Sequence, residues 1–65
     1  MTMDKRMLIA RLRQLQAVDK NALAVYTELA RLTDDNFQRK VFSGIAADEQ
    51  RHVALGEEML LLLEK

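Results

Sequence analysis

Apolar residues recur along this chain with the spacing of an α-helix. When each residue is advanced by ~100°, most apolar side chains in each half of the chain gather along one side of a helix. Proline is absent, and both halves are rich in leucine, alanine, glutamine, arginine and glutamate, which are good helix formers. The pattern predicts an all-α protein with two long helices, at about residues 3–33 and 36–64.

One break separates the two predicted helices. Residues 33–36 read Thr-Asp-Asp-Asn, and these side chains bond to nearby backbone, which favours turns and helix starts over helix interiors. Either Thr2 or Asp4 is expected to cap the first helix. Because a short connection between long helices makes them antiparallel neighbours, we expect residues 1–65 to form a single domain, a helical hairpin.

The apolar surface of both helices is wider than a hairpin can cover. Val18, Val25 and Leu32 recur outside the main stripe of the first helix, and residues 59–63 are apolar all round. A hairpin has one internal interface, and a chain this short buries only about 60% of the surface that its unfolded form exposes. The pattern therefore predicts a homodimer that forms a four-helix bundle, with the apolar end favouring a higher homo-oligomer.

Three ionisable residues lie inside the apolar stripes. Burying an unpaired charge costs several kcal/mol, so these residues need partners. The off-stripe carboxylates of Glu28, Glu57 and Glu58 are expected to lie at the surface. Asp19 shares an arc of ~60° with Leu8, Leu12, Leu15, Ala22, Tyr26 and Ala30, and His52 shares one with Phe37, Val41, Ile45, Glu49, Leu55, Met59 and Leu63.

Glu49 and His52 form a Glu-x-x-His step whose side chains are neighbours on one helix face. Two arrangements would compensate Asp19, Glu49 and His52: a hydrogen-bonded network across the hairpin, or a divalent metal ion held by all three. Carboxylate and imidazole ligands suit iron, manganese or zinc. One hairpin offers three ligands, whereas two hairpins about a two-fold axis offer six, enough for a dinuclear site.

Composition narrows the range of partners and locations. Ten basic and ten acidic residues cancel, so the general attraction of basic proteins to nucleic acid or anionic lipid is missing. The longest apolar run, residues 59–63, is far below the roughly 20 residues of a membrane-spanning helix, and the start has no secretory apolar segment. We expect a cytoplasmic protein with neither a nucleic-acid nor a membrane partner.

Several motifs together resemble the ferritin-like superfamily, especially rubrerythrin-type domains and two-helix half-ferritins of the encapsulated-ferritin kind. Asp19, Ala22 and Tyr26 occupy the frame of that superfamily's Glu-x-x-Ala-x-x-x-Tyr motif. Residues 48–52, Asp-Glu-Gln-Arg-His, look like its Glu-x-x-His ligand step, and the 30-residue gap between Asp19 and Glu49 is similar to that in half-ferritins. The resemblance runs from about residue 15 to residue 63.

The resemblance implies a dinuclear iron site in which Glu49 bridges two ions, His52 is a terminal ligand, Asp19 supplies another carboxylate and Tyr26 stands nearby. It implies ferroxidase-like oxidation of ferrous ion by oxygen or peroxide, with manganese or zinc as other metals. The family has glutamate where this chain has Asp19, which is one methylene shorter. Peroxide reduction and zinc storage at the same site are further readings, and a metal-free helical dimerisation or interaction module is the alternative from another class.

Five other residues of the second half have possible structural roles that do not depend on the resemblance. Gly44 and Gly56 interrupt a helix and indicate either close approach by a neighbouring helix or mere tolerance. Asp48, beside the Glu49 and His52 pair, could orient an imidazole N–H. Arg39 and Lys40 read as ordinary solvated charges.

Overall fold

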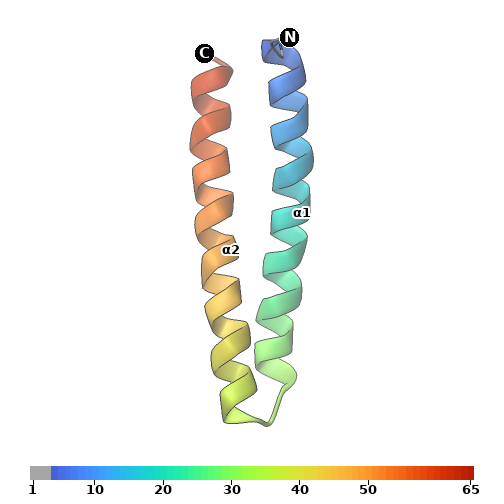
Figure 1. Cartoon of the computed structure of the whole chain (residues 1–65), viewed down its shortest axis with the longest axis vertical. Coiled ribbons are helices and arrows are strands. Elements are labelled where there is room, and N and C mark those ends of the chain that lie inside the picture. The colour runs from blue at the N-terminus through green and yellow to red at the C-terminus, as the bar shows by residue number, and fades with distance from the viewer. Residues whose placement is uncertain (1–3) are drawn as a thin grey trace.

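Residues 4–65, the part of the chain that the computed structural model describes, form two antiparallel helices. Helix α1 runs over Lys5–Leu32 and helix α2 over Asn36–Leu63, with 28 residues in each. Figure 1 shows the connection at one end of a rod and both termini at the other, and the rod measures 48 × 17 × 17 Å. The all-α hairpin is confirmed; the predicted start at residue 3 and the cap by Thr2 lie outside the described residues.

Each helix begins at an aspartate that caps it. Asp4 Oδ1 accepts a hydrogen bond from the backbone N–H of Met7 at 2.9 Å, and Asp35 Oδ1 accepts one from that of Gln38 at 2.7 Å. These carboxylates satisfy N–H groups that have no partner within the helix, and their charge suits the positive end of the helix dipole. The cap by Asp4 and the turn before residue 36 were both predicted.

Arg39 closes the turn from the other side. Its guanidinium donates to the backbone oxygens of Thr33 and Ala30 at 2.7 and 3.3 Å and to Oδ1 of Asn36 at 3.3 Å. The last carbonyl groups of a helix lack partners within it, and a cation there also suits the negative end of the helix dipole. Arg39 is therefore exposed, as predicted, and it also caps the C-terminal end of α1, a role that the sequence pattern did not predict.

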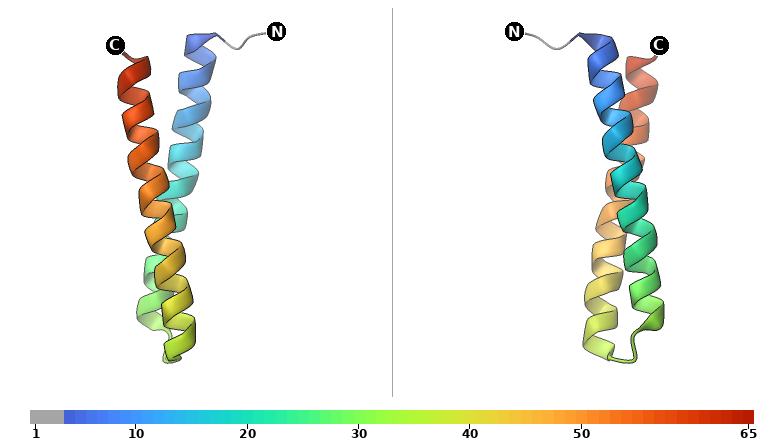
Figure 2. Two further views of the ribbon diagram at one scale, coloured as in Figure 1. Left: turned by 60° about the vertical axis from the view of Figure 1, so that its left-hand side comes forward. Right: turned by 90° about the vertical axis from the view of Figure 1, so that its right-hand side faces the viewer.

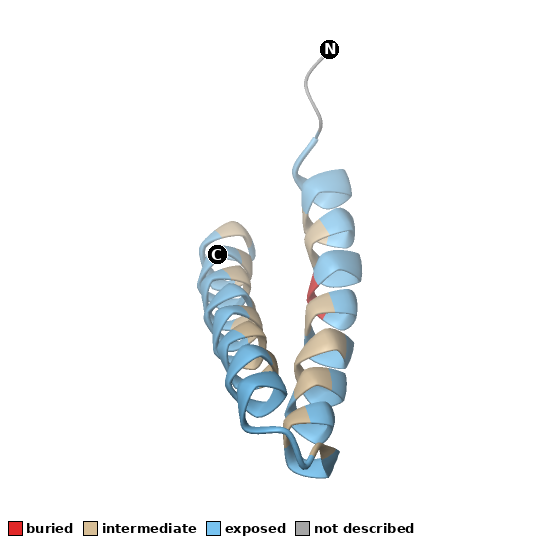
Figure 3. Cartoon of the chain, turned by 60° about the horizontal axis from the view of Figure 1, so that its bottom comes forward, coloured by how far each residue is buried: buried red, intermediate tan, exposed pale blue. Residues whose placement is uncertain are grey.

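The two helices meet along a row of residues spaced alternately three and four apart, the spacing of a coiled coil. Of residues 4–65, Gln16 alone is buried, at 6% exposure, and every apolar residue keeps more contact with solvent (Figure 3). The hairpin thus has an interface but no dry core. The row comprises Ile9, Leu12, Gln16, Asp19, Leu23, Tyr26 and Ala30 on α1 and Phe42, Ala46, Glu49, Val53, Gly56, Leu60 and Leu63 on α2.

The two long faces beside this row differ in character. On one, which we call the charged face, Arg13 pairs with Glu64, and Lys20 Nζ lies 3.5 Å from Glu57 Oε1. On the other, which we call the groove face, the helices border a groove of about 380 Å³. In both views of Figure 2 one helix passes across the other, so the helices cross instead of lying strictly parallel. The groove is lined by Leu12, Leu15, Gln16, Asp19, His52, Leu55, Gly56 and Met59.

The predicted apolar stripes are centred to one side of the α1–α2 contact, toward the groove face. Several side chains expected inside are exposed in the hairpin, namely Leu8, Leu15, Phe37, Val41, Leu55 and Met59. Helical periodicity gives the middle of an apolar stripe but does not separate the part that covers the other helix from the part that stays exposed in the hairpin. Neither α1 nor α2, within residues 4–65, combines the length and apolar composition that crossing a membrane requires.

Replacing Arg39 by alanine is expected to lower the free energy of unfolding by about 1–2 kcal/mol, because the last carbonyl groups of α1 lose a charged donor. Lys40→Ala is the matched control, since Lys40 is an exposed neighbour on the same helix, and it should change stability by less than about 0.5 kcal/mol. Urea unfolding followed by circular dichroism at one protein concentration measures both. Equal losses in the two variants would contradict the capping role.

Candidate metal centre

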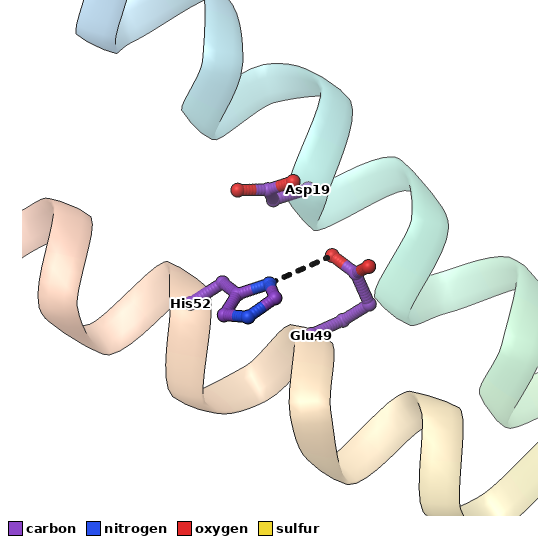
Figure 4. A group of neighbouring side chains, drawn as sticks. All are labelled: Asp19, Glu49 and His52. Carbon is purple, nitrogen blue, oxygen red and sulfur yellow. Dashed lines mark ion pairs between the residues drawn. The ribbon is translucent and has the colours of Figure 1, made fainter.

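The structure brings the three predicted ligands together. Asp19 comes from α1, and Glu49 and His52 come from successive turns of α2; one ligand atom from each lies within 4.8 Å of the other two. Figure 4 shows the Asp19 carboxylate directed across the gap toward the pair on α2. His52 Nδ1 is 3.9 Å from Glu49 Oε2. The convergence expected from helical phase is therefore present within one hairpin.

The cluster lies midway along the rod. Asp19 is the fifteenth of the 28 residues of α1, and Glu49 is the fourteenth of the 28 residues of α2. Helix ends fray while helix centres are held on both sides, so the cluster lies away from the parts of the helices that fray most readily. A second hairpin that overlapped the first along its full length would bring its own three residues to the same level.

The three side chains differ in their contact with solvent. The Glu49 side chain is 20% exposed, Asp19 is partly buried, and the His52 side chain is 55% exposed. The prediction that His52 faces inward is therefore wrong for a single hairpin. The imidazole lies on the groove face, where a ligand or a second subunit can reach it.

Glu49 carries an uncompensated oxygen. Its Oε2 is buried and accepts no hydrogen bond from the described part of the chain. Leaving a buried polar atom without a partner costs about 1–3 kcal/mol, and more for a charged group. Native proteins rarely tolerate such an atom unless a function, a water or an ion compensates it. This carboxylate therefore calls for a cation or a hydrogen-bond donor.

The geometry of the cluster fits one divalent ion with a small adjustment. Bonds from zinc to histidine nitrogen or carboxylate oxygen are about 2.0–2.2 Å long, so two ligands of one ion lie at most roughly 4.4 Å apart. The separations here are at most 4.8 Å, and a modest rotation about the side-chain bonds closes the difference. Two carboxylates and one imidazole form a donor set suited to iron, manganese or zinc.

Two other acidic residues pair with arginines and do not join the cluster. Asp48 Oδ1 is 2.7 Å from a guanidinium nitrogen of Arg51, and Glu28 Oε1 is 3.7 Å from one of Arg31. In the hairpin Asp48 is thus an arginine partner, not a group that orients His52. Glu28 lies at the surface, as predicted.

Tyr26 lies in the apolar layer between the cluster and the turn. Its ring centroid is 6.3 Å from that of Phe42, with the ring planes tilted by 37°. It follows Asp19 by seven residues, which is about 10 Å along a helix. This packing is what an amphipathic core residue makes, and a catalytic role for Tyr26 stays a prediction.

Gln16 is the neighbour of the cluster that sequence reasoning missed. It is the buried residue of the hairpin, and its Nε2 donates to the backbone oxygen of Val53 at 3.0 Å. Gln16 lies one turn before Asp19 on the same helix face. Its sequence signal was present but weak: a polar residue at a core position, level with the glycine at position 56 of the opposite helix.

Comparisons with known proteins add no information on the role of these residues. Models of protein families, curated proteins and solved structures were each searched, and none matches this chain.

Proposed function

We propose that this protein binds a dinuclear site of iron, or of another divalent metal, between two copies of the hairpin and oxidises ferrous ion with oxygen or peroxide. The convergence of Asp19, Glu49 and His52 around the unpartnered Oε2 of Glu49 carries this proposal. A bound cation would supply positive charge that balances the negative charge of this buried oxygen. It also gives an imidazole and two carboxylates on facing helices one common partner.

The surface area of the hairpin favours a second copy. The chain exposes 5299 Å², whereas a compact protein of this mass exposes roughly 4,200 Å². The excess of roughly 1,000 Å² is comparable to the about 800 Å² that each partner contributes to a standard interface. Because no apolar residue of 4–65 is buried, a dimer interface would supply the core that one hairpin lacks.

The groove face is the side that the second copy covers. The charged face already joins its own helices through the Arg13–Glu64 and Lys20–Glu57 pairs. The groove face instead exposes Leu15, Leu55 and Met59 beside the metal ligands. Packing two groove faces about a two-fold axis buries this apolar surface. It also brings two sets of three ligands together, so dimerisation and completion of the site are one event.

The chemistry assigned to each residue follows from its position. Glu49, whose Oε2 is buried, would hold metal through its carboxylate together with His52 and Asp19. The apolar side chains of the groove face keep bulk water away. When bound, a pair of ferrous ions supplies two electrons, enough to reduce oxygen to hydrogen peroxide or peroxide to water. The protein's part is positioning and charge balance.

A metal-free dimerisation module is the second candidate, favoured by the exposed apolar residues of the groove face. In that case the buried Glu49 oxygen would find a donor on the partner subunit instead of a metal. Peroxide reduction and zinc storage use the same ligands and differ in oxidant consumption and metal preference. Metal binding therefore distinguishes the metal site from the metal-free module. Turnover and metal preference distinguish ferrous-ion oxidation, peroxide reduction and zinc storage.

Glu49→Gln tests the metal site directly. The amide has the same shape without the charge, so the metal-free variant should be at least as stable as the wild type, whereas its metal affinity should fall by about two orders of magnitude or more. Glu58→Gln is the control, because Glu58 is exposed on the same helix. Calorimetric titration with Mn²⁺ and oxygen uptake with Fe²⁺ give the two readouts.

We expect about one ion per chain in the wild type and in Glu58→Gln, with oxygen consumption on adding Fe²⁺. A wild-type protein that binds no iron, manganese or zinc would contradict the proposal and favour the metal-free module. Metal bound with unchanged affinity by Glu49→Gln would show that the ligands lie elsewhere.

Leu15→Lys tests the dimer. A lysine in the middle of the groove face would be buried unpaired in the dimer, so the variant should be monomeric, less helical and weak in metal binding. Asn21→Lys adds the same charge at an exposed position of α1 and should leave the dimer intact. Sedimentation equilibrium measures the molecular mass. A dimeric Leu15→Lys protein would contradict the placement of the interface.

A further inference from the structure

One polar contact joins the two helices beside the candidate metal centre. The Gln16 side chain from α1 reaches across to α2, where its Nε2 donates to the Val53 oxygen at 3.0 Å and its amide lies over Gly56. At 6% exposure it is more buried than any other residue of 4–65. A buried amide needs a partner, and this one finds it on the opposite helix.

Gly56 provides the space for that amide. A Cβ atom placed on Gly56 would fall 2.6 Å from Cδ of Gln16 and closer still to its Oε1. The glycine is therefore required by the position of the Gln16 amide and not by its own backbone. Gly44, the other glycine of α2, has nothing within 4 Å of such a Cβ. Of the two readings of these glycines, close approach holds for Gly56, and Gly44 meets no neighbour.

The contact fixes how far α1 and α2 are slid along each other. Moving one helix by a single residue shifts it by about 1.5 Å, enough to break a hydrogen bond of this length and leave a buried amide unpaired. It would also place a residue with a side chain where Gly56 now leaves room. Apolar pairs along the interface tolerate small shifts, whereas a buried polar contact of this kind favours one register.

The register matters most at the next turn. Gln16 precedes Asp19 by three residues, and Val53 directly follows His52 in sequence; Gln16, Gly56, Asp19 and His52 line the same groove. Asp19 belongs to one helix and the other two ligands belong to the other, so the distance between them depends on the register of the helices. Metal–ligand distances hold to about ±0.2 Å, far less than a slip of one residue.

We propose that Gln16 is a positioning residue for the candidate metal centre. Its amide, held between the Val53 oxygen and the bare Cα of Gly56, sets the helix register that brings Asp19 to Glu49 and His52. This inference rests on the proposed function, because it gives Gln16 a role toward the metal ligands and not only in stability.

Cobalt binding tests this role, because the visible absorption of Co²⁺ reports the geometry of its ligands as well as its affinity. Gln16→Met keeps the length of the side chain and removes the amide. Gly56→Ala displaces the amide, which is the far end of a flexible side chain, and so leaves the backbone free to fold. Gly44→Ala is the matched control, with the same change on the same helix and no neighbour to disturb.

We expect Gln16→Met and Gly56→Ala to stay helical, to lose about tenfold or more in Co²⁺ affinity, and to change the shape of the absorption band at saturation. Gly44→Ala should keep the wild-type affinity and spectrum. A purely structural contact would alter thermal stability but not the saturated spectrum. If Gln16→Met does not fold, Gly56→Ala decides alone.

Register is also measurable without metal. The chain has no cysteine, so spin labels attached at Ala10→Cys and Glu58→Cys, both exposed positions, report the offset of the helices when diluted with unlabelled protein. The distance distribution should shift or broaden in Gln16→Met and not in Gly44→Ala.

Wild-type affinity, spectrum and label distances in Gln16→Met and Gly56→Ala would overturn the role of Gln16 while leaving the metal site standing. A wild-type protein that binds no cobalt, manganese or iron would instead overturn the proposed function, and the positioning role with it.

Discussion

A buried carboxylate oxygen that accepts no hydrogen bond, at the middle of a hairpin without a dry core, is the constraint on which the rest of the structure depends. Glu49 Oε2 has no hydrogen-bond donor within residues 4–65, and each apolar residue there retains exposed surface. The Glu49 oxygen and many of the exposed apolar side chains lie at or beside the groove face. A second hairpin with metal between the copies meets both at once, which is why we treat assembly and metal binding as a single event.

The two faces divide the work of the chain. Ion pairs on the charged face and the caps at Asp4, Asp35 and Arg39 hold each hairpin together and close its ends. Exposed pairs of this kind contribute little to stability, typically up to about 1 kcal/mol each, so they define the pairing of the helices more than they stabilise it. The groove face is left free for the contact that would contribute most, the burial of apolar surface.

Local signals made the helices and the turn predictable from the sequence. Helical phase also predicted that Asp19 and Glu49 face each other. In a regular helix the position of a residue in the sequence determines the face on which its side chain lies. The exposure of His52 was not predictable, since a wide apolar stripe does not show which part of it the other helix of the hairpin covers. The cap by Arg39 and the contact of Gln16 were missed because both use backbone oxygens: those of Ala30 and Thr33 at the end of α1, and that of Val53 on α2. Backbone partners leave no trace in the side-chain pattern, and only the glycine at 56 hinted at one.

Anomalous X-ray scattering from crystals of the protein grown with Mn²⁺, or soaked with Fe²⁺ without oxygen, tests the central claim most directly. The account predicts a pair of peaks at a two-fold axis, each within bonding distance of Glu49, with His52 and Asp19 of the two copies completing the set. Crystals that show two packed groove faces and no anomalous density there, or density only at surface carboxylates such as Glu28, would contradict it.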